Sequence, residues 1–143
     1  MKWKIFKELN VPCADISYQW ISEENSRLII IMHFSRVVEG FEKDLELIFF
    51  NPIALQWEDE CYPIFDLPEK LPKCTKKGFE DWTYPTLIIP NSQWADRYDK
   101  SFAINERHDN QQLKHFVLIS MNDILSILSC EMPNVKLIDS QDI

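Results

Sequence analysis

Residues 27–38 read RLIIIMHFSRVV and decide the fold, because they alternate with the period of a β-strand. One set of alternate positions is wholly apolar and the other becomes polar toward its end; the two sets are Leu28, Ile30, Met32 and Phe34, and Ile29, Ile31, His33 and Ser35. One face of this strand is therefore buried. Gly40 follows where the chain has to turn, and residues 44–50 (DLELIFF) alternate again, so the two stretches predict a β-hairpin.

Further strands are expected after this hairpin. Pro52 ends its second strand, because proline cannot donate a hydrogen bond to a central ladder, and residues 53–58 (IALQWE) predict a third strand. Residues 87–90 (LIIP) and 113–120 (LKHFVLIS) predict two more. Between these two strands we expect a brief helix over residues 94–98, capped by Asn91 or Ser92.

Residues 124–130 (ILSILSC) are compatible with either a helix or a strand. Their apolar pairs recur every three residues behind a possible cap at Asn122 or Asp123, which favours a helix. Their position after a strand and a tight turn favours the second arm of a hairpin, and the strand is preferred. The predicted class is α+β, a predominantly antiparallel β-sheet (a curled sheet or half-barrel) with one or two short helices.

Residues 58–85 have a different character from the rest of the chain. They contain Gly78 and four of the eight prolines, namely Pro63, Pro68, Pro72 and Pro85. Prolines at this density prevent a long helix or a central strand. We therefore predict a long, irregular, proline-rich excursion within a single domain that spans residues 1–143. Loops of this length in compact domains are often binding surfaces.

The composition excludes several classes of function. Fifteen Lys and Arg residues against 23 Asp and Glu residues give a net charge of −8, which argues against nucleic acid as a partner. The two glycines, Gly40 and Gly78, are too few for a phosphate-binding P-loop or a dinucleotide fingerprint. They are also too far apart for the GxSxG turn of a serine hydrolase.

The chain is expected to act in the cytoplasm and not at a membrane. Its first ten residues alternate basic and apolar side chains without the apolar run of a secretory signal, and the longest apolar run, residues 28–32, is too short to span a bilayer. The four cysteines should then be reduced thiols; they are Cys13, Cys61, Cys74 and Cys130. Their spacing contains no CxxC pair, so neither a disulfide nor zinc is expected.

The histidines give little support for catalysis or metal binding. His33 has no carboxylate nearby in sequence, and no two histidines have the spacing of an HExxH motif. A dispersed three-histidine metal site and a Cys74–His115 nucleophile pair are the alternatives, and neither has a distinctive local motif. We therefore expect no catalytic residues, metal or cofactor.

Acidic residues beside tryptophans are the better candidates for a functional site. One acidic cluster follows Trp57 at the end of the third strand, and a second lies in the irregular excursion. Carboxylates pair with basic groups of a partner, while an exposed aromatic supplies a buried anchor. The candidate partner-binding residues are Glu58, Asp59, Glu60, Glu80, Asp81 and Trp82. Trp57 is expected to pack inward and Trp82 to be the anchor. The alternatives are a solvated acidic face and a pair of catalytic carboxylates like that of a glycosidase.

Four segments together resemble a known group of proteins. They are residues 82–87 (WTYPTL), 91–94 (NSQW), 115–117 (HFV) and 122–128 (NDILSIL). In this order they are similar to small bacterial proteins encoded beside polymorphic or contact-dependent toxins, which are regarded as immunity proteins. The resemblance covers residues 27–138 in outline. It implies a cytoplasmic, non-catalytic protein that binds and neutralises one toxin domain.

These observations lead to one functional hypothesis and two alternatives. The hypothesis is a non-catalytic immunity protein whose acidic, aromatic-containing surface binds a cognate, cationic bacterial toxin domain. The first alternative is a protein-binding or adaptor domain with an unrelated partner. The second is a small hydrolase.

Overall fold

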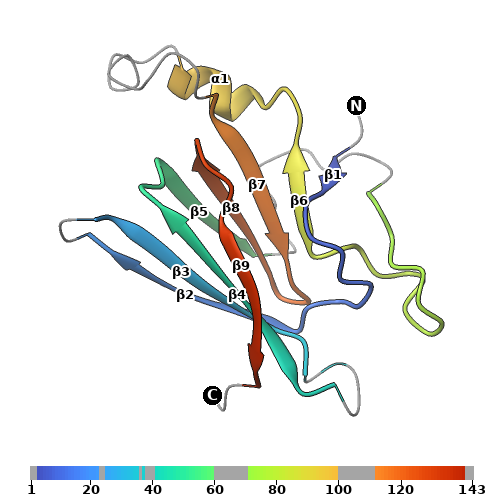
Figure 1. The fold of residues 1–143 in the computed structure, drawn as a ribbon. Coiled ribbons are helices and arrows are strands. Elements are labelled where there is room, and N and C mark those ends of the chain that lie inside the picture. The colour runs from blue at the N-terminus through green and yellow to red at the C-terminus, as the bar shows by residue number, and fades with distance from the viewer. Residues whose placement is uncertain are drawn as a thin grey trace.

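The chain forms two antiparallel β-sheets and one short helix in the part that a computed structural model describes, residues 3–22, 25–35, 37, 41–59, 71–99 and 112–140 (Figure 1). The elements are β1 (Lys4–Ile5), β2 (Asp15–Ile21), β3 (Arg27–His33), β4 (Lys43–Phe50), β5 (Ala54–Asp59), β6 (Thr86–Ile89), α1 (Gln93–Asp99), β7 (Lys114–Ile119), β8 (Asp123–Ser129) and β9 (Asn134–Asp139). The larger sheet has the order β1-β6-β7-β8-β5 and the smaller one β2-β3-β4-β9. The predicted fold class is confirmed.

The hairpin predicted from residues 27–38 and 44–50 is present as β3 and β4. Leu28 lies opposite Phe49 and Met32 opposite Leu45, so the apolar sets of both strands share one face. The first strand ends at His33, whereas the alternation in the sequence extends to Val38.

The main core lies between the two sheets. The inward residues of the hairpin are completely buried and pack against the inward residues of β7 and β8; they are Leu28, Ile30, Met32, Leu45, Leu47 and Phe49, with Phe116, Leu118, Leu125 and Ile127 opposite. The Phe116 ring meets Phe49 edge-on, with centroids 5.0 Å apart and an interplanar angle of 67°. Burial of alternate residues from both sheets therefore holds the layers together.

The predicted strand after residue 122 and the predicted capped helix are both present, and two further strands were not predicted. Residues 123–129 form strand β8, which pairs with β7 as a hairpin arm and with β5 on its other edge. Ser92 is the cap of α1, because its Oγ accepts the backbone N–H of Ala95 at 3.1 Å. β1 and β2 were not anticipated, since β1 has two residues and β2 is a half-exposed edge strand.

The proline-rich segment is described over residues 71–85, whereas residues 60–70 lie outside the described part. Residues 71–85 contain no helix or strand, and a single bridge joins Lys73 to Thr83. Residues 71–85 are thus irregular, whereas residues 58 and 59 of the predicted excursion belong to β5. No helix among the described residues is long and apolar enough to cross a membrane.

Candidate functional site at the acidic end of the sheets

The turn between β7 and β8 organises one end of the molecule. The Ser120 Oγ accepts the backbone N–H groups of Asn122 at 3.2 Å and Asp123 at 2.9 Å, so a local side chain holds the turn. The Asn122 side-chain amide donates to the Asp15 carboxylate at 3.0 Å, which ties the start of β2 to the turn. Two sheets therefore meet here.

Three carboxylates gather at this turn from three strands. Asp123 begins β8 and lies opposite Asp59 at the end of β5, while Asp15 begins β2. Burial raises the pKa of Asp123, and the negative charges of Asp15 and Asp59 raise it further, whereas a hydrogen bond from Trp57 lowers it. Asp123 therefore lies within reach of the charges of both Asp15 and Asp59.

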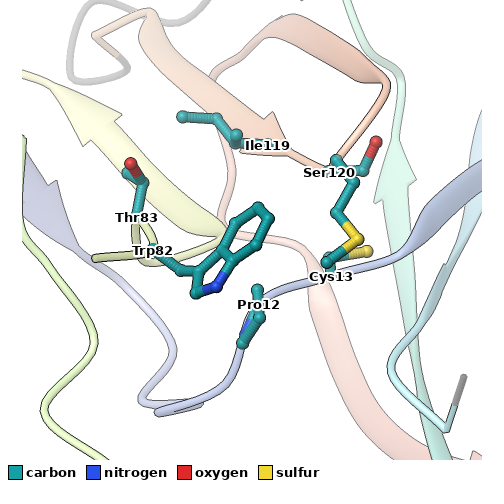
Figure 2. A pocket seen from close by; sticks show the side chains of 7 residues that line it. Pro12, Cys13, Trp82, Thr83, Ile119 and Ser120 are labelled. Atoms are coloured by element: carbon teal, nitrogen blue, oxygen red, sulfur yellow. The ribbon is translucent and has the colours of Figure 1, made fainter. Parts of the chain in front are cut away.

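Two exposed tryptophans lie near this turn. Trp57 is 51% exposed and Trp82 is 40% exposed. Figure 2 shows the Trp82 indole beside Pro12 and Ile119, in a pocket that Met121 of the β7–β8 turn also lines. This pocket measures about 50 Å³, against roughly 300–1,000 Å³ for the sites of small organic ligands. This pocket is therefore too small to enclose a typical organic ligand.

The acidic cluster predicted after the third strand is only partly a surface feature. Glu58 is 3% exposed, so it cannot reach a partner, and the expectation that Trp57 packs inward is wrong. The reason is strand geometry: successive side chains of β5 point to opposite faces, and β5 is an edge strand of the larger sheet among the described strands. Asp59 is exposed, and Glu60 lies outside the described residues.

The second predicted cluster lies on the surface as expected. Glu80, Asp81 and Trp82 are all exposed. The Glu80 carboxylate accepts the backbone N–H of Gly78 at 3.0 Å, and the Lys73 ammonium donates to the Asp81 carbonyl oxygen at 3.1 Å. These contacts order the segment that carries Trp82.

Sequence reasoning missed two members of the site. Asp15 and Asp123 join the predicted Asp59 only because β2, β5 and β8 end together. The turn at residues 121–123 was visible in the sequence, but its charged neighbours come from positions more than 60 residues away. We call the acidic end the set Asp15, Asp59, Glu80, Asp81 and Asp123 together with Trp57 and Trp82.

His33 has a carboxylate partner that is not adjacent to it in sequence. Its Nδ1 lies 3.0 Å from Oδ2 of Asp44, and its Nε2 lies 3.3 Å from the Ser17 Oγ. Asp44 is eleven residues away in sequence but directly across the β3–β4 hairpin. The sequence-based interpretation of His33 as a residue without such a partner is therefore incomplete.

His115 is buried near the helix and does not meet Cys74 in any described contact. Its Nδ1 lies 2.7 Å from the Ser92 Oγ, whereas the Cys74 thiol donates to the Thr83 carbonyl oxygen at 3.8 Å. Burial lowers the pKa of His115 to about 4. Burial also raises the pKa of the Cys74 and Cys13 thiols, which makes both poor nucleophiles.

The cysteines of the described residues are free thiols, and Cys61 lies outside them; the three are Cys13, Cys74 and Cys130. The described residues contain no group of three or more His, Cys, Asp or Glu side chains arranged to hold a metal ion.

The fold and the acidic end define a two-sheet antiparallel β-protein with an exposed aromatic and acidic surface. Comparisons with protein-family models, with curated proteins and with solved structures give no match to this chain.

Proposed function

We propose that this chain is an immunity protein that binds a cationic bacterial toxin domain in the cytoplasm and neutralises it stoichiometrically, without need of a catalytic step. The observation that carries the proposal is the acidic end, where two exposed tryptophans lie near the turn at which Asp15, Asp59 and Asp123 gather. A toxin domain with a basic active-site surface, such as a nuclease, has the complementary chemistry.

The electrostatics of the acidic end favour a basic partner. Burial raises the pKa of Asp123, and the charges of Asp15 and Asp59 raise it further. An Arg or Lys side chain placed among the three carboxylates would remove this repulsion and pair with the ionised forms. The net charge of −8 would also steer a cationic domain during its approach.

The tryptophans supply the short-range part of the interaction. Trp57 and Trp82 together present large apolar rings with polar indole N–H groups, and residues of this type dominate binding energy when a partner buries them. Long-range charge therefore sets the rate of association, and burial of the rings sets the rate of dissociation.

The test is a pair of matched charge reversals. We expect Asp59→Lys to weaken binding of the toxin domain encoded beside this gene by at least tenfold, about 1.4 kcal/mol. The control is Glu131→Lys, which makes the same charge change at an exposed position past the opposite end of β8. Equal affinities of the two variants would remove the acidic end from the interface.

Two further measurements are the salt dependence of the association rate and binding to the toxin domain encoded beside the gene. Raising the salt concentration from 50 to 500 mM shortens the screening length from about 14 to about 4 Å, so association should slow strongly while dissociation changes less. The adaptor alternative would be favoured by two results together. The chain would bind no toxin domain encoded beside its gene, and its affinity for an unrelated basic partner would depend on Asp59.

A further inference from the structure

A serine, a histidine and an aspartate line up across three neighbouring strands of the smaller sheet. Ser17 belongs to β2, His33 ends β3 and Asp44 lies in β4. The His33 ring touches both other side chains, with Nδ1 3.0 Å from Asp44 Oδ2 and Nε2 3.3 Å from Ser17 Oγ. This order of contacts is the one that activates a serine nucleophile, and such triads are recognised by geometry and not by sequence position.

Asp44 is held in one orientation. It is completely buried, and its Oδ1 accepts the backbone N–H of Phe34 at 3.0 Å and the Ser35 hydroxyl at 3.2 Å. Its other oxygen, Oδ2, lies 3.0 Å from Nδ1 of His33. An ionised Asp44 can only accept a hydrogen bond, so Nδ1 of His33 donates to it; in a neutral His33, Nε2 is then the acceptor that faces Ser17.

The exposure of the three residues fits an accessible nucleophile supported by buried partners. His33 is 2% exposed and is shielded, whereas Ser17 lies exposed on the edge strand where a reactant can reach it. The described thiols that are buried, Cys13 and Cys74, have raised pKa values and are poor competitors as nucleophiles.

We propose that Ser17, His33 and Asp44 form a nucleophilic triad that cleaves small, uncharged carboxylic esters. Ile31 lies directly opposite Ser17, and Ile29 is the next residue on the same face of β3; both are half-buried and offer an apolar surface for an acyl group. Asp15, two residues before Ser17, would repel an anionic ester.

The reaction proceeds in two balanced steps. The Ser17 Oγ forms a bond to the ester carbonyl carbon while its proton passes to His33 Nε2; the bond to the leaving alkoxide breaks, and the alkoxide takes that proton from Nε2. Water then attacks the acyl-serine and gives a proton to Nε2. Ser17 Oγ leaves and recovers the proton, so the ester and one water become an acid and an alcohol.

This activity goes beyond the proposed function and is independent of it. It also departs from the sequence-based expectation of no catalytic residues, since Ser17, His33 and Asp44 share no local motif. Binding to a toxin domain can fail while esterase activity persists, and the reverse also holds.

The test uses the full chain with p-nitrophenyl acetate as substrate and a fluorophosphonate as a covalent label. We expect release of p-nitrophenol and a label that peptide mass spectrometry locates on Ser17. Ser17→Ala should lower the rate about 100-fold or more, the usual contribution of a general base and its nucleophile. The matched control is Ser22→Ala, an exposed serine just past the end of β2, which should retain the wild-type rate.

Asp44 acts through His33 as a positioning residue and needs a separate readout. Asp44→Asn should lower kcat and leave KM unchanged, in a variant that still unfolds cooperatively. If the variant loses activity only because it no longer folds, Asp44 has a structural role and is not a positioning residue. The proposal is overturned if Ser17→Ala hydrolyses the ester as fast as the wild type, if the label attaches elsewhere, or if the wild type is no faster than buffer.

Discussion

His115 gives a quantitative expectation for stability against pH. It lies in β7 with 1% of its surface exposed, and burial lowers its pKa from 6.5 to about 4. The unfolded chain therefore binds a proton at this residue near pH 6.5, whereas the folded chain binds it only near pH 4. Because the unfolded state binds more protons between these values, stability is present above pH 6.5 and is lost as the pH falls toward 4.

The size of the effect follows from the two pKa values. Between pH 7 and pH 4.5 the unfolded state gains about three quarters of a proton at His115 and the folded state gains about one quarter. The resulting loss in the free energy of unfolding is about 2 kcal/mol, since each pKa unit corresponds to about 1.4 kcal/mol. This is a large share of the stability of an ordinary domain.

The assay compares the wild type with His115→Gln, which retains an amide for Ser92 but does not titrate. Urea unfolding at pH 7 and pH 4.5 measures both proteins, and the carboxylates affect both alike. We expect the variant to lose about 2 kcal/mol less than the wild type over this interval. An NMR titration should place the His115 pKa near 4. Equal losses in both proteins, or a pKa near 6.5, would refute the reasoning.

Two further predictions follow from the core and the thiols. Phe116→Ala should lower the free energy of unfolding by about 3–5 kcal/mol, because the ring fills the space between the sheets, whereas Leu137→Ala, at a position 49% exposed, should cost far less in the same urea experiment. Native alkylation followed by peptide mass spectrometry should modify the half-buried Cys130 before Cys13 and Cys74, which are buried with raised pKa values. Faster modification of Cys13 would contradict this ranking.

The period-two alternation of residues 27–38 and 44–50 predicted the hairpin correctly because one face of each strand is buried in the core. The cap at Ser92 was also visible, since a hydroxyl before a helix accepts a backbone N–H in a purely local contact. The strand at residues 124–130 was recognised from its place after a turn, although its own periodicity was ambiguous. Local rules sufficed for these elements.

Such local rules did not predict which side chains of the third strand are exposed and which are buried. Trp57 and Glu58 read as an inward tryptophan followed by an exposed acid, yet the tryptophan is exposed and the acid is buried. Alternation assigns neighbours to opposite faces but does not say which face is covered. That depends on the pairing of β5 with β8 at the edge of the larger sheet.

The sequence by itself determined the strand-rich class, the central hairpin, the capped helix and the acidic balance, because each rests on local periodicity or on composition. Only the tertiary structure decided that Asp15, Asp59 and Asp123 meet at one turn, and that Ser17, His33 and Asp44 meet across three strands. The physical reason is that strand pairing and sheet packing bring together side chains distant in sequence. Their proximity is fixed by the register of backbone hydrogen bonds and the burial of the core, which no single segment encodes.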